Sequence, residues 1–527
     1  MNYIVNANLM KKIDKATIEE HNIPSLVLME RAALSVVNTM ESEKLCDGFT
    51  TIVCGTGNNA ADGVAIARML CLKGKSVAVI LVGDSERHTD ELTSQINSAV
   101  SYGVPFYEFS LSKDKCSELI NNADTVVDAI FGIGLSRAIE GDFAEIINAV
   151  NVSSAKVISV DMPSGYNTDT GVCLNAGIKA DITVCFSYLK KGLLLSDCYL
   201  NAGKVVVTDV GIYLEDKNTD VAYQITDEEL TLIHKKAKGA NKGTNAKILV
   251  IAGSEDIYGA CYLSALAAMK AGAGYVKIFT HKNNIATLQD KLPEAVCISY
   301  DESLLENFRS FEADGDLKEC IIKEDKIKSL KAAIDFADAV VIGPGLSTSE
   351  LSKEILEFTI KNVNKPLIID ADGINLIAAD NGLLAQISEH CRQSGDSPVI
   401  ITPHLAEMGR LTGKSIKELN DSMEENAITF SREYGIVTVL KNYTTVITDG
   451  KRVFINNSGD ESLATAGSGD VLSGIVTAFA GMKMDCCLSA ALAAYVHGKA
   501  GVKASNNLNT KNVLAGEVAL NILKSEI

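Results

Sequence analysis

Asp470 lies in a glycine-rich stretch at residues 463–474, LATAGSGDVLSG, directly before an apolar run typical of a buried helix. The backbone N–H groups of Gly467, Ser468 and Gly469 would point into one hollow, and a helix N-terminus attracts phosphate oxygens. A carboxylate at such a terminus is favoured in its negative form and would be available as a base at neutral pH. N-capping alone would explain the aspartate, but it would not explain the glycines on both sides. We therefore interpret Asp470 as a base beside a bound phosphate.

Other polar loops follow apolar runs in the second half of the chain. They are GPGLS at residues 343–347, DADGIN at 370–375 and TPHLAEMGRL at 402–411. A Gly-Pro-Gly turn brings backbone close to a ligand, and His404 and Glu407 would share one face if their segment is helical. This His–Glu spacing is weak evidence for a metal site, because no second histidine stands at an interval typical of zinc.

The first half of the chain carries polar loops of the same kind. They are CGTGNNAADG at residues 54–63, VVDAIFGIGLSR at 126–137 and VDMPSG at 160–165. The first loop could be a tight turn with Asp62 as the N-cap of the next helix. However, ligands of open parallel sheets bind outside the carboxyl ends of the strands, so these loops could converge on one pocket.

These loops require elements that place them together. Runs of β-branched residues alternate with helical patterns in both halves, which predicts two α/β domains with parallel sheets covered by helices. Strands are predicted at 51–54, 76–82, 125–129, 157–160, 182–186, 205–207, 247–252, 275–279, 339–342, 367–369, 399–402 and 437–440. Helices are predicted at 62–72, 258–271, 471–480 and 488–499. The last helix contains His497, for which we predict a structural role, and a charged segment near 214–245 places the domain link at 213–221.

Composition excludes several functional classes. The chain has 527 residues, which suggests two to four domains at roughly 150 residues each. Its net charge of −18 disfavours nucleic acids and anionic membranes as partners. The 13 cysteines include no CxxC pair, and no apolar run approaches the length of about 20 residues that a membrane helix needs. We therefore expect a cytoplasmic protein without a disulfide framework or a structural zinc site.

The three loops of the first half, in this order, resemble the GxGNNGGDG, DAxFGxG and DxPSG loops of the NAD(P)H-hydrate epimerases. The resemblance implies a Rossmann-like fold for residues 1–215, a bound K⁺ ion and Asp161 as the catalytic acid/base beside the substrate hydroxyl. By position, the K⁺ ligands would be Asn59, Asp128 and Ser164. The substrate-binding positions would be Asn58, Asn59, Ala60, Ala61, Asp62, Gly132, Ile133, Gly134, Leu135, Ser136, Arg137, Ala138 and Asp161.

Ala60 and Ala61 depart from this pattern, because the family usually has two glycines there. Alanine resists positive φ, so the loop would be strained if either position requires that conformation. A domain that has lost the epimerase activity and only supports its partner is therefore one alternative for the first half.

The motifs of the second half resemble, also in order, those of the ribokinase-like NAD(P)H-hydrate dehydratases that use ADP or ATP. They are AGS…YGAC at 252–261, GPG, DAD, TPHxxE, KNYTT and AGSGDVLSG. The resemblance implies that residues 222–527 use ADP to phosphorylate the hydrate, which then loses phosphate, with Mg²⁺ assisting the transfer. The hydrate-binding positions would be Ala260, Gly345, His404 and Asp470, and the nucleotide-binding positions Lys441, Asn442, Tyr443, Thr444, Thr445 and Gly469. Asn442 replaces the glycine that the family usually has after the lysine.

Together these resemblances predict a bifunctional repair enzyme. It would interconvert R- and S-NAD(P)HX and dehydrate the S epimer to NAD(P)H with ADP, giving AMP and phosphate. Its partners would be NADHX, NADPHX and ADP, and we expect a homo-oligomer. Two alternatives remain open: a ribokinase-like kinase of vitamin precursors, and a dehydratase whose N-terminal domain is a non-catalytic scaffold.

Overall fold

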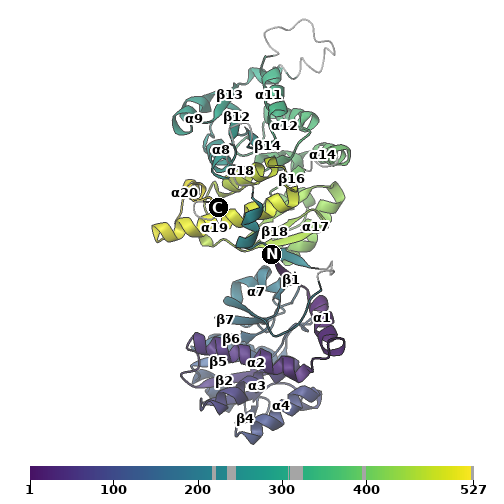
Figure 1. The fold of residues 1–527 in the computed structure, drawn as a ribbon, viewed down its shortest axis with the longest axis vertical. Helices are drawn as coiled ribbons and strands as arrows, with labels where there is room; N and C mark the ends of the chain where they lie inside the picture. The colour runs from purple at the N-terminus through teal and green to yellow at the C-terminus, as the bar shows by residue number, and fades with distance from the viewer. Residues whose placement is uncertain (216–220, 234–244, 307, 309–324, 395–398, 524–527) are drawn as a thin grey trace. The chain divides into compact units, whose positions relative to one another are not determined.

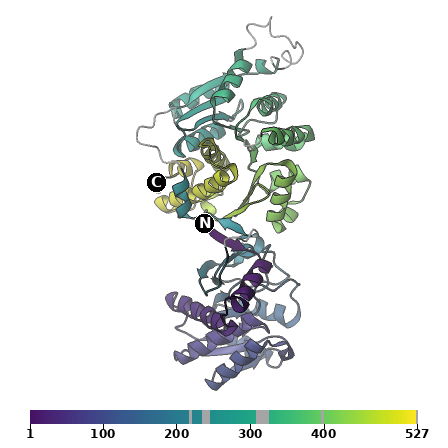
Figure 2. The ribbon, with the colours of Figure 1, turned by 45° about the vertical axis from the view of Figure 1, so that its right-hand side comes forward.

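The computed structural model describes residues 1–215, 221–233, 245–306, 308, 325–394 and 399–523. The chain divides into two compact units, Asn2–Ala222 and Tyr223–Ile527, with Met1 assigned to the second unit (Figures 1 and 2). The predicted link at 213–221 falls partly outside the described residues, which omit 216–220. In the described part of the chain, no helix has both the length and the apolar character needed to cross a membrane.

The first unit contains a parallel sheet with the strand order β4-β3-β2-β5-β6-β7-β9. Its strands are β2 (Thr50–Cys54), β3 (Val77–Leu81), β4 (Phe106–Glu108), β5 (Thr125–Ala129), β6 (Lys156–Val160), β7 (Ile182–Phe186) and β9 (Lys204–Thr208). The strand order reverses between β2 and β5, and ligands of open α/β sheets bind at such a switch point. The first two polar loops of this unit follow these two strands.

Helices cover this sheet, and a short second pairing lies beside it. The helices are α1 (Ala7–Glu19), α2 (Ser25–Ser42), α3 (Asn58–Leu72), α4 (Asp90–Ser101), α5 (Lys113–Asn121), α6 (Gly141–Val152) and α7 (Ser196–Asn201). β1 (Asn2–Val5) pairs in parallel with β8 (Leu189–Lys190). The predicted start of α3 was wrong, because the helix begins at Asn58 with Gly57 as its N-cap. Asp62 therefore lies inside the helix and does not cap it.

The second unit contains a larger sheet, ordered β13-β12-β11-β14-β15-β16-β17-β18-β19-β10. The parallel strands are β11 (Lys247–Ile251), β12 (Tyr275–His281), β13 (Val296–Tyr300), β14 (Ala339–Ile342), β15 (Leu367–Ile369), β16 (Val399–Ile401) and β17 (Val437–Lys441). β18 (Thr445–Thr448) and β19 (Val453–Asn456) continue it antiparallel, and β10 (Ala222–Gln224) pairs with β19. Here the order reverses between β11 and β14, so the expected ligand crevice lies at their carboxyl ends.

The helices of the second unit include the two predicted Ala-rich ones. They are α8 (Gly259–Lys270), α9 (Ile285–Lys291), α11 (Asp325–Phe336), α12 (Glu350–Asn362), α13 (Asp372–Ala379), α14 (Asn381–Ser394), α15 (Leu405–Thr412), α16 (Ile416–Asp421), α17 (Met423–Tyr434), α18 (Ser468–Gly481), α19 (Cys486–Leu508) and α20 (Ala515–Leu520). α8 packs closely on α18 (Figure 1). A Cβ at Gly474 would lie 2.3 Å from the carbonyl oxygen of Ser264, so this close approach requires glycine. The packing fixes the N-terminus of α18, and with it Asp470, against α8.

Candidate active sites

The first candidate site begins with Asp128, a buried carboxylate near the end of β5. Its Oδ2 accepts hydrogen bonds from Ser159 Oγ and Ser164 N, both 2.8 Å long. Its Oδ1 accepts from Ser164 Oγ at 2.5 Å and from Ile130 N at 3.3 Å. Burial raises the pKa of Asp128, and the hydrogen bonds from Ser164 oppose that rise. The pairing of β5 with β6 places Ser159 directly opposite Asp128, which explains how strand register builds this site.

Two of the three predicted K⁺ ligands, Asp128 and Ser164, are in contact. The third, Asn59, lies in the first turn of α3, and a Cβ at Gly132 would lie 3.4 Å from its side chain. The amide nitrogen of Asn59 is buried and has no hydrogen-bond partner among the described residues. The oxygen and nitrogen of an amide are assigned rather than observed, so the side chain can equally present its oxygen at this place. Amide, hydroxyl and carboxylate oxygens are suited to a hard cation, so these residues fit K⁺.

Asp161 follows β6 in a left-handed backbone conformation, with φ of 65°. Its Oδ1 accepts a hydrogen bond from Phe186 N at 3.0 Å and forms an ion pair with the buried Lys190. Two further carboxyl groups surround it. Burial and the charge of Asp161 raise the pKa of Asp14, and burial, Asp161 and Asp14 raise that of Asp62 well above its ordinary value. Several acidic groups therefore converge on the predicted acid/base.

Ala60 and Ala61 are fully buried in the first turns of α3, and neither has positive φ. Neither position requires positive φ, so the two alanines do not strain this loop. The predicted substrate loop 132–138 joins β5 to α6. Ser136, Arg137 and Ala138 are exposed there, whereas the side chain of Leu135 is buried in the core of the unit.

The second candidate site centres on Asp370, which directly follows β15 and is buried. Its Oδ1 accepts hydrogen bonds from Thr402 Oγ1 at 2.6 Å and from Lys441 Nζ at 3.1 Å. The next residue, Ala371, has φ of 50° and ψ of −117°. A non-glycine residue in such a conformation is costly and persists only where the surroundings enforce it, which is common at functional sites. The sequence indicated a polar loop at 370–375, but it predicted no role for Asp370.

Asp470 is the third residue of α18, whose N-cap is Gly467 with φ of 87°. The predicted start of this helix at residue 471 was therefore wrong, and Asp470 does not act as the N-cap, the alternative that we had set aside. A Cβ at Gly469 would lie 3.3 Å from Lys441 Nζ and 4.0 Å from Asp370 Oδ2, which brings the glycine turn and the ammonium together. The turn thus combines a helix N-terminus, a cation and a carboxylate, but the N–H group of Ser468, one of the three predicted donors, already bonds Thr465 O at 3.2 Å.

The charge state of Asp470 differs from what its helix terminus predicts. Its pKa is raised to about 7, mainly by burial and also by the charges of Asp370 and Asp372, while Lys441 opposes the rise. The helix dipole favours the ionised form by about 0.3–1 kcal/mol at an exposed terminus, which these larger effects exceed. A carboxyl group with a pKa near neutrality is well matched to general-base catalysis.

His404 and Glu407 do share the start of α15, but as a helix cap. His404 Nδ1 accepts hydrogen bonds from Ala406 N and Glu407 N, and Glu407 Oε2 accepts one from His404 N at 2.8 Å. Burial lowers the pKa of His404, as do Lys441 and Arg410. With Nδ1 accepting, the neutral imidazole carries its proton on Nε2. The site therefore offers a neutral N–H donor beside Lys441, whose backbone N–H bonds Pro403 O at 2.8 Å.

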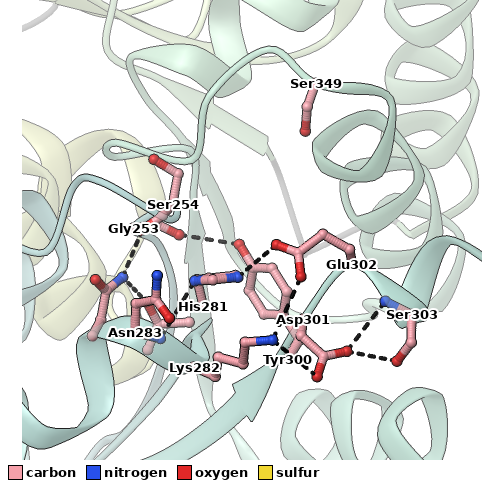
Figure 3. A network of polar contacts seen from close by, with 12 residues as sticks. Gly253, Ser254, His281, Lys282, Asn283, Tyr300, Asp301, Glu302, Ser303 and Ser349 are labelled. Atoms are coloured by element: carbon pink, nitrogen blue, oxygen red, sulfur yellow. Dashed lines mark hydrogen bonds and ion pairs between the residues drawn. The ribbon is translucent and has the colours of Figure 1, made fainter.

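Ala260 and Gly345, both predicted to bind the hydrate, lie side by side. Gly345 has φ of 58°, and a Cβ there would lie 3.0 Å from Ala260 Cβ and 2.7 Å from Ile257 Cγ2. The loop that precedes Ala260 is held by a polar network (Figure 3). In it, Tyr300 Oη donates to Gly253 O at 3.1 Å and Asn284 Nδ2 donates to Ser254 O at 2.9 Å.

The other predicted nucleotide-binding residues lie next to Lys441. Asn442, Tyr443 and Thr444 form the turn between β17 and β18, and β18 begins at Thr445. Thr444 is buried, and its hydroxyl has no hydrogen-bond partner among the described residues. Asn442 Nδ2 donates to Asn420 Oδ1 at 2.9 Å. The turn therefore places these residues directly after Lys441, with the side chain of Asn442 held by Asn420.

His497 lies within 3.1 Å of Ser468 Oγ and is buried, which lowers its pKa to about 4. It is neutral at physiological pH and supports the turn at the start of α18, as its predicted structural role requires. No described group of three or more His, Cys, Asp or Glu side chains is arranged to hold a metal ion. Mg²⁺ is usually bound by one or two carboxylates together with substrate phosphates, so it would enter this site with a nucleotide.

Sequence patterns missed two residues of these sites, Lys190 and Asp14. Lys190 stands in the stretch SYLKKGLLL, where no motif separates it from its neighbour Lys191. Asp14 lies in α1, far from the polar loops in sequence. Only the structure distinguishes Lys190 from Lys191, because it shows that Lys190 is fully buried.

Two known families account for most of the chain. Residues 248–524 match the family described as NAD(P)H-hydrate dehydratase, and residues 25–192 match the YjeF-related protein N-terminus. The bifunctional NAD(P)H-hydrate repair enzyme of Moorella thermoacetica is 32% identical over 98% of this chain and 95% of its own length. The enzyme of the same description from Escherichia coli is 28% identical over 89% of this chain and 83% of its own.

Solved structures are similar to part of the chain. The ADP/ATP-dependent NAD(P)H-hydrate dehydratase of Bacillus subtilis, co-crystallised with ATP and Mg²⁺, is 25% identical. It covers 56% of this chain and 95% of its own, with a TM-score of 0.44. The family matches and the relative of 32% identity span both units in the order seen here, so the chain belongs to the family of bifunctional NAD(P)H-hydrate repair enzymes.

Proposed function

We propose that the first unit, predicted as 1–215, epimerises R- and S-NAD(P)HX, and that the second, predicted as 222–527, dehydrates S-NAD(P)HX to NAD(P)H with ADP. The observation that carries this proposal is the arrangement of Asp470, Gly469, Lys441 and Asp370 at one corner of the second sheet. It joins a base with a pKa near neutrality to an anion-binding turn and a cation.

In the second unit, Asp470 accepts the proton of the hydrate hydroxyl, whose oxygen attacks the β-phosphoryl group of ADP. AMP leaves as the new O–P bond forms. The carbon–oxygen bond then breaks, inorganic phosphate departs, and loss of a proton restores the dihydronicotinamide. Bound Mg²⁺ would offset the charge of the phosphoryl groups during transfer.

The remaining predicted residues of this unit bind and orient the two substrates. Lys441 and the N–H groups around Gly469 hold phosphate oxygens, because the ammonium lies beside the open glycine turn. Ala260 and Gly345 form a close backbone wall for the hydrate, and His404 donates its Nε2 proton to a hydrate or phosphate oxygen. The turn 442–445 takes the rest of the nucleotide.

In the first unit, Asp161 accepts the proton of the hydrate hydroxyl as the bond between the hydroxyl-bearing carbon and the ring nitrogen breaks, which leaves an aldehyde. The nitrogen then re-forms this bond on the opposite face of the carbonyl carbon, and Asp161 returns the proton to the oxygen, so that the carbon is inverted. The loops 58–62 and 132–138 hold the substrate around this carboxylate. A K⁺ ion bound by Asn59, Asp128 and Ser164 would supply a fixed positive charge beside these loops. Its support here is the unpartnered amide of Asn59 and the buried carboxylate of Asp128.

The test follows recovery of NADH by absorbance at 340 nm. Mixed R- and S-NADHX is supplied with ADP, Mg²⁺ and K⁺, and wild type is compared with Asp470→Asn and Asp161→Asn. Full recovery by wild type, none by Asp470→Asn and rapid recovery of the S fraction alone by Asp161→Asn would support both activities. Accumulation of a stable phosphorylated product without NADH would instead favour a vitamin-precursor kinase, and identical epimer exchange in Asp161→Asn would favour a scaffold role for the first unit.

The prediction of a homo-oligomer remains a proposal, which light scattering of the purified chain would test. Cytoplasmic residence likewise remains a proposal, and its support is the absence of CxxC pairs from a sequence with 13 cysteines.

A further inference from the structure

Lys190 is a charged residue with no exposed surface, which is rare unless the charge is paired. It ends β8, and its backbone pairs with Val5 of β1. Its ammonium has three N–H donors, and these bond three acceptors: Asp161 Oδ1, Phe186 O at 2.9 Å and Cys185 Sγ at 3.5 Å. Each of the three N–H bonds therefore has a partner, so the position of the ammonium is fixed.

This arrangement treats the two oxygens of Asp161 differently. Oδ1 accepts from Phe186 N at 3.0 Å and from Lys190, which fills both of its lone pairs. Oδ2 has no hydrogen-bond partner among the residues that the structure describes, and Asp161 is 9% exposed. The backbone of Asp161 is held at φ of 65°, a conformation that the surroundings must enforce. One oxygen is thus anchored and the other is available to a ligand.

The titratable groups around the pair come from several elements. Asp14 of α1, Asp62 of α3 and Cys185 of β7 all interact electrostatically with Asp161 or Lys190. Burial alone would lower the pKa of Lys190, but the attraction of Asp161 and of Cys185 raises it above its ordinary value. The ammonium therefore keeps its charge in the interior and offsets the carboxylates that converge there.

We propose that Lys190 is a positioning residue for the epimerisation: it fixes Asp161 Oδ1, so that Oδ2 alone meets the hydroxyl of the hydrate. This inference rests on the proposed epimerase function of the first unit. Lys190 itself does not exchange protons with the substrate, because its donors are committed to Asp161, Phe186 and Cys185.

The test is Lys190→Met, which keeps the length of the side chain and removes its charge. Epimerisation of R-NADHX is measured as kcat and KM between pH 5.5 and 9, with the background without enzyme subtracted. We expect kcat to fall about tenfold, with a smaller change in KM. This loss is smaller than the roughly 10²- to 10⁴-fold loss expected when an acid–base group itself is removed.

Two controls separate positioning from folding. Lys156→Met removes a comparable Lys–Asp pair of the same unit, but an exposed one, in which Nζ lies 2.8 Å from Asp181 Oδ1, and should leave kcat unchanged. Lys190→Arg keeps the charge and should recover most of the kcat that Lys190→Met loses. The rate of dehydration of pure S-NADHX by the same preparations shows whether the second unit of each variant is folded and active.

The outcomes are distinct. An unchanged kcat in Lys190→Met would overturn the proposal. Equal loss of epimerisation in Lys190→Met and Lys190→Arg would assign Lys190 a structural role and would also overturn it. If wild type does not epimerise R-NADHX at all, the proposed function of the first unit fails instead.

Discussion

The pKa of Asp470 predicts a pH dependence for dehydration that an ordinary aspartate would not give. Burial, together with the charge of Asp370, raises this pKa to about 7. Only the ionised carboxylate can accept the hydroxyl proton, so the active fraction follows its titration: about one eleventh at pH 6, half at pH 7 and ten elevenths at pH 8. We therefore expect kcat/KM for S-NADHX to rise about tenfold from pH 6 to pH 8. An aspartate at its ordinary pKa of about 3.9 would give a flat profile over this range.

Initial rates at 340 nm with pure S-NADHX, saturating ADP and Mg²⁺ measure this profile. ADP also titrates near neutrality, so a variant must separate the two groups. Asp372 raises the pKa of Asp470, and Asp372→Asn should therefore move the rise to lower pH, whereas titration of ADP would stay in place. Asp380→Asn, at the other end of α13, is the matched control and should not move it.

Two results would refute the reasoning. A flat profile between pH 6 and pH 8 would mean that Asp470 is ionised throughout or is not the base. A rise that stays at the same pH in Asp372→Asn would mean that another group titrates.

Further variants test the walls of the two sites. Gly345→Ala forces an alanine to φ of 58° with its Cβ 2.7 Å from Ile257 Cγ2, so urea unfolding should show a loss of about 1–2 kcal/mol, and the KM for S-NADHX should rise. Gly516→Ala, in open space within α20, should instead stabilise by about 0.5–1 kcal/mol, and equal effects of both would contradict the strain at Gly345. Tyr300→Phe removes the hydrogen bond to Gly253 O and should cost about 0.5–1.5 kcal/mol in the same assay, an expectation that an unchanged midpoint would rule out. Replacing K⁺ by a larger organic cation should slow epimerisation of R-NADHX and leave dehydration of S-NADHX unaffected, and equal epimerisation rates in both salts would count against a K⁺ site.

Much of the fold follows from patterns in the sequence. Buried parallel strands read as short apolar, β-branched runs, and the twelve predicted strands all occur within two residues of their predicted bounds. Strands with mixed polarity were missed. β4 has only three residues and is partly exposed, and the antiparallel pair β18–β19 follows a turn that we interpreted as a nucleotide loop.

Some site residues could be predicted from the sequence and others could not. Loops at the carboxyl ends of strands could be predicted, because strand order forces them to one edge of the sheet. The charge state of Asp470 could not be predicted from its helix terminus, because burial and two carboxylates distant in sequence determine it. Lys190 was missed for a similar reason: its role depends on Asp161, which lies 29 residues away.

The two proposed catalytic carboxylates differ in their neighbours, and this difference gives the strongest combined test. Asp161 is paired with a buried ammonium, whereas the charges of Asp370 and Asp372 raise the pKa of Asp470. Removing a neighbour should therefore affect the two activities in different ways. Lys190→Met lowers kcat for epimerisation, and Asp372→Asn moves the rise of dehydration to lower pH. General destabilisation of the chain by either substitution would not produce this pair of changes, since each variant should also leave the other activity in place.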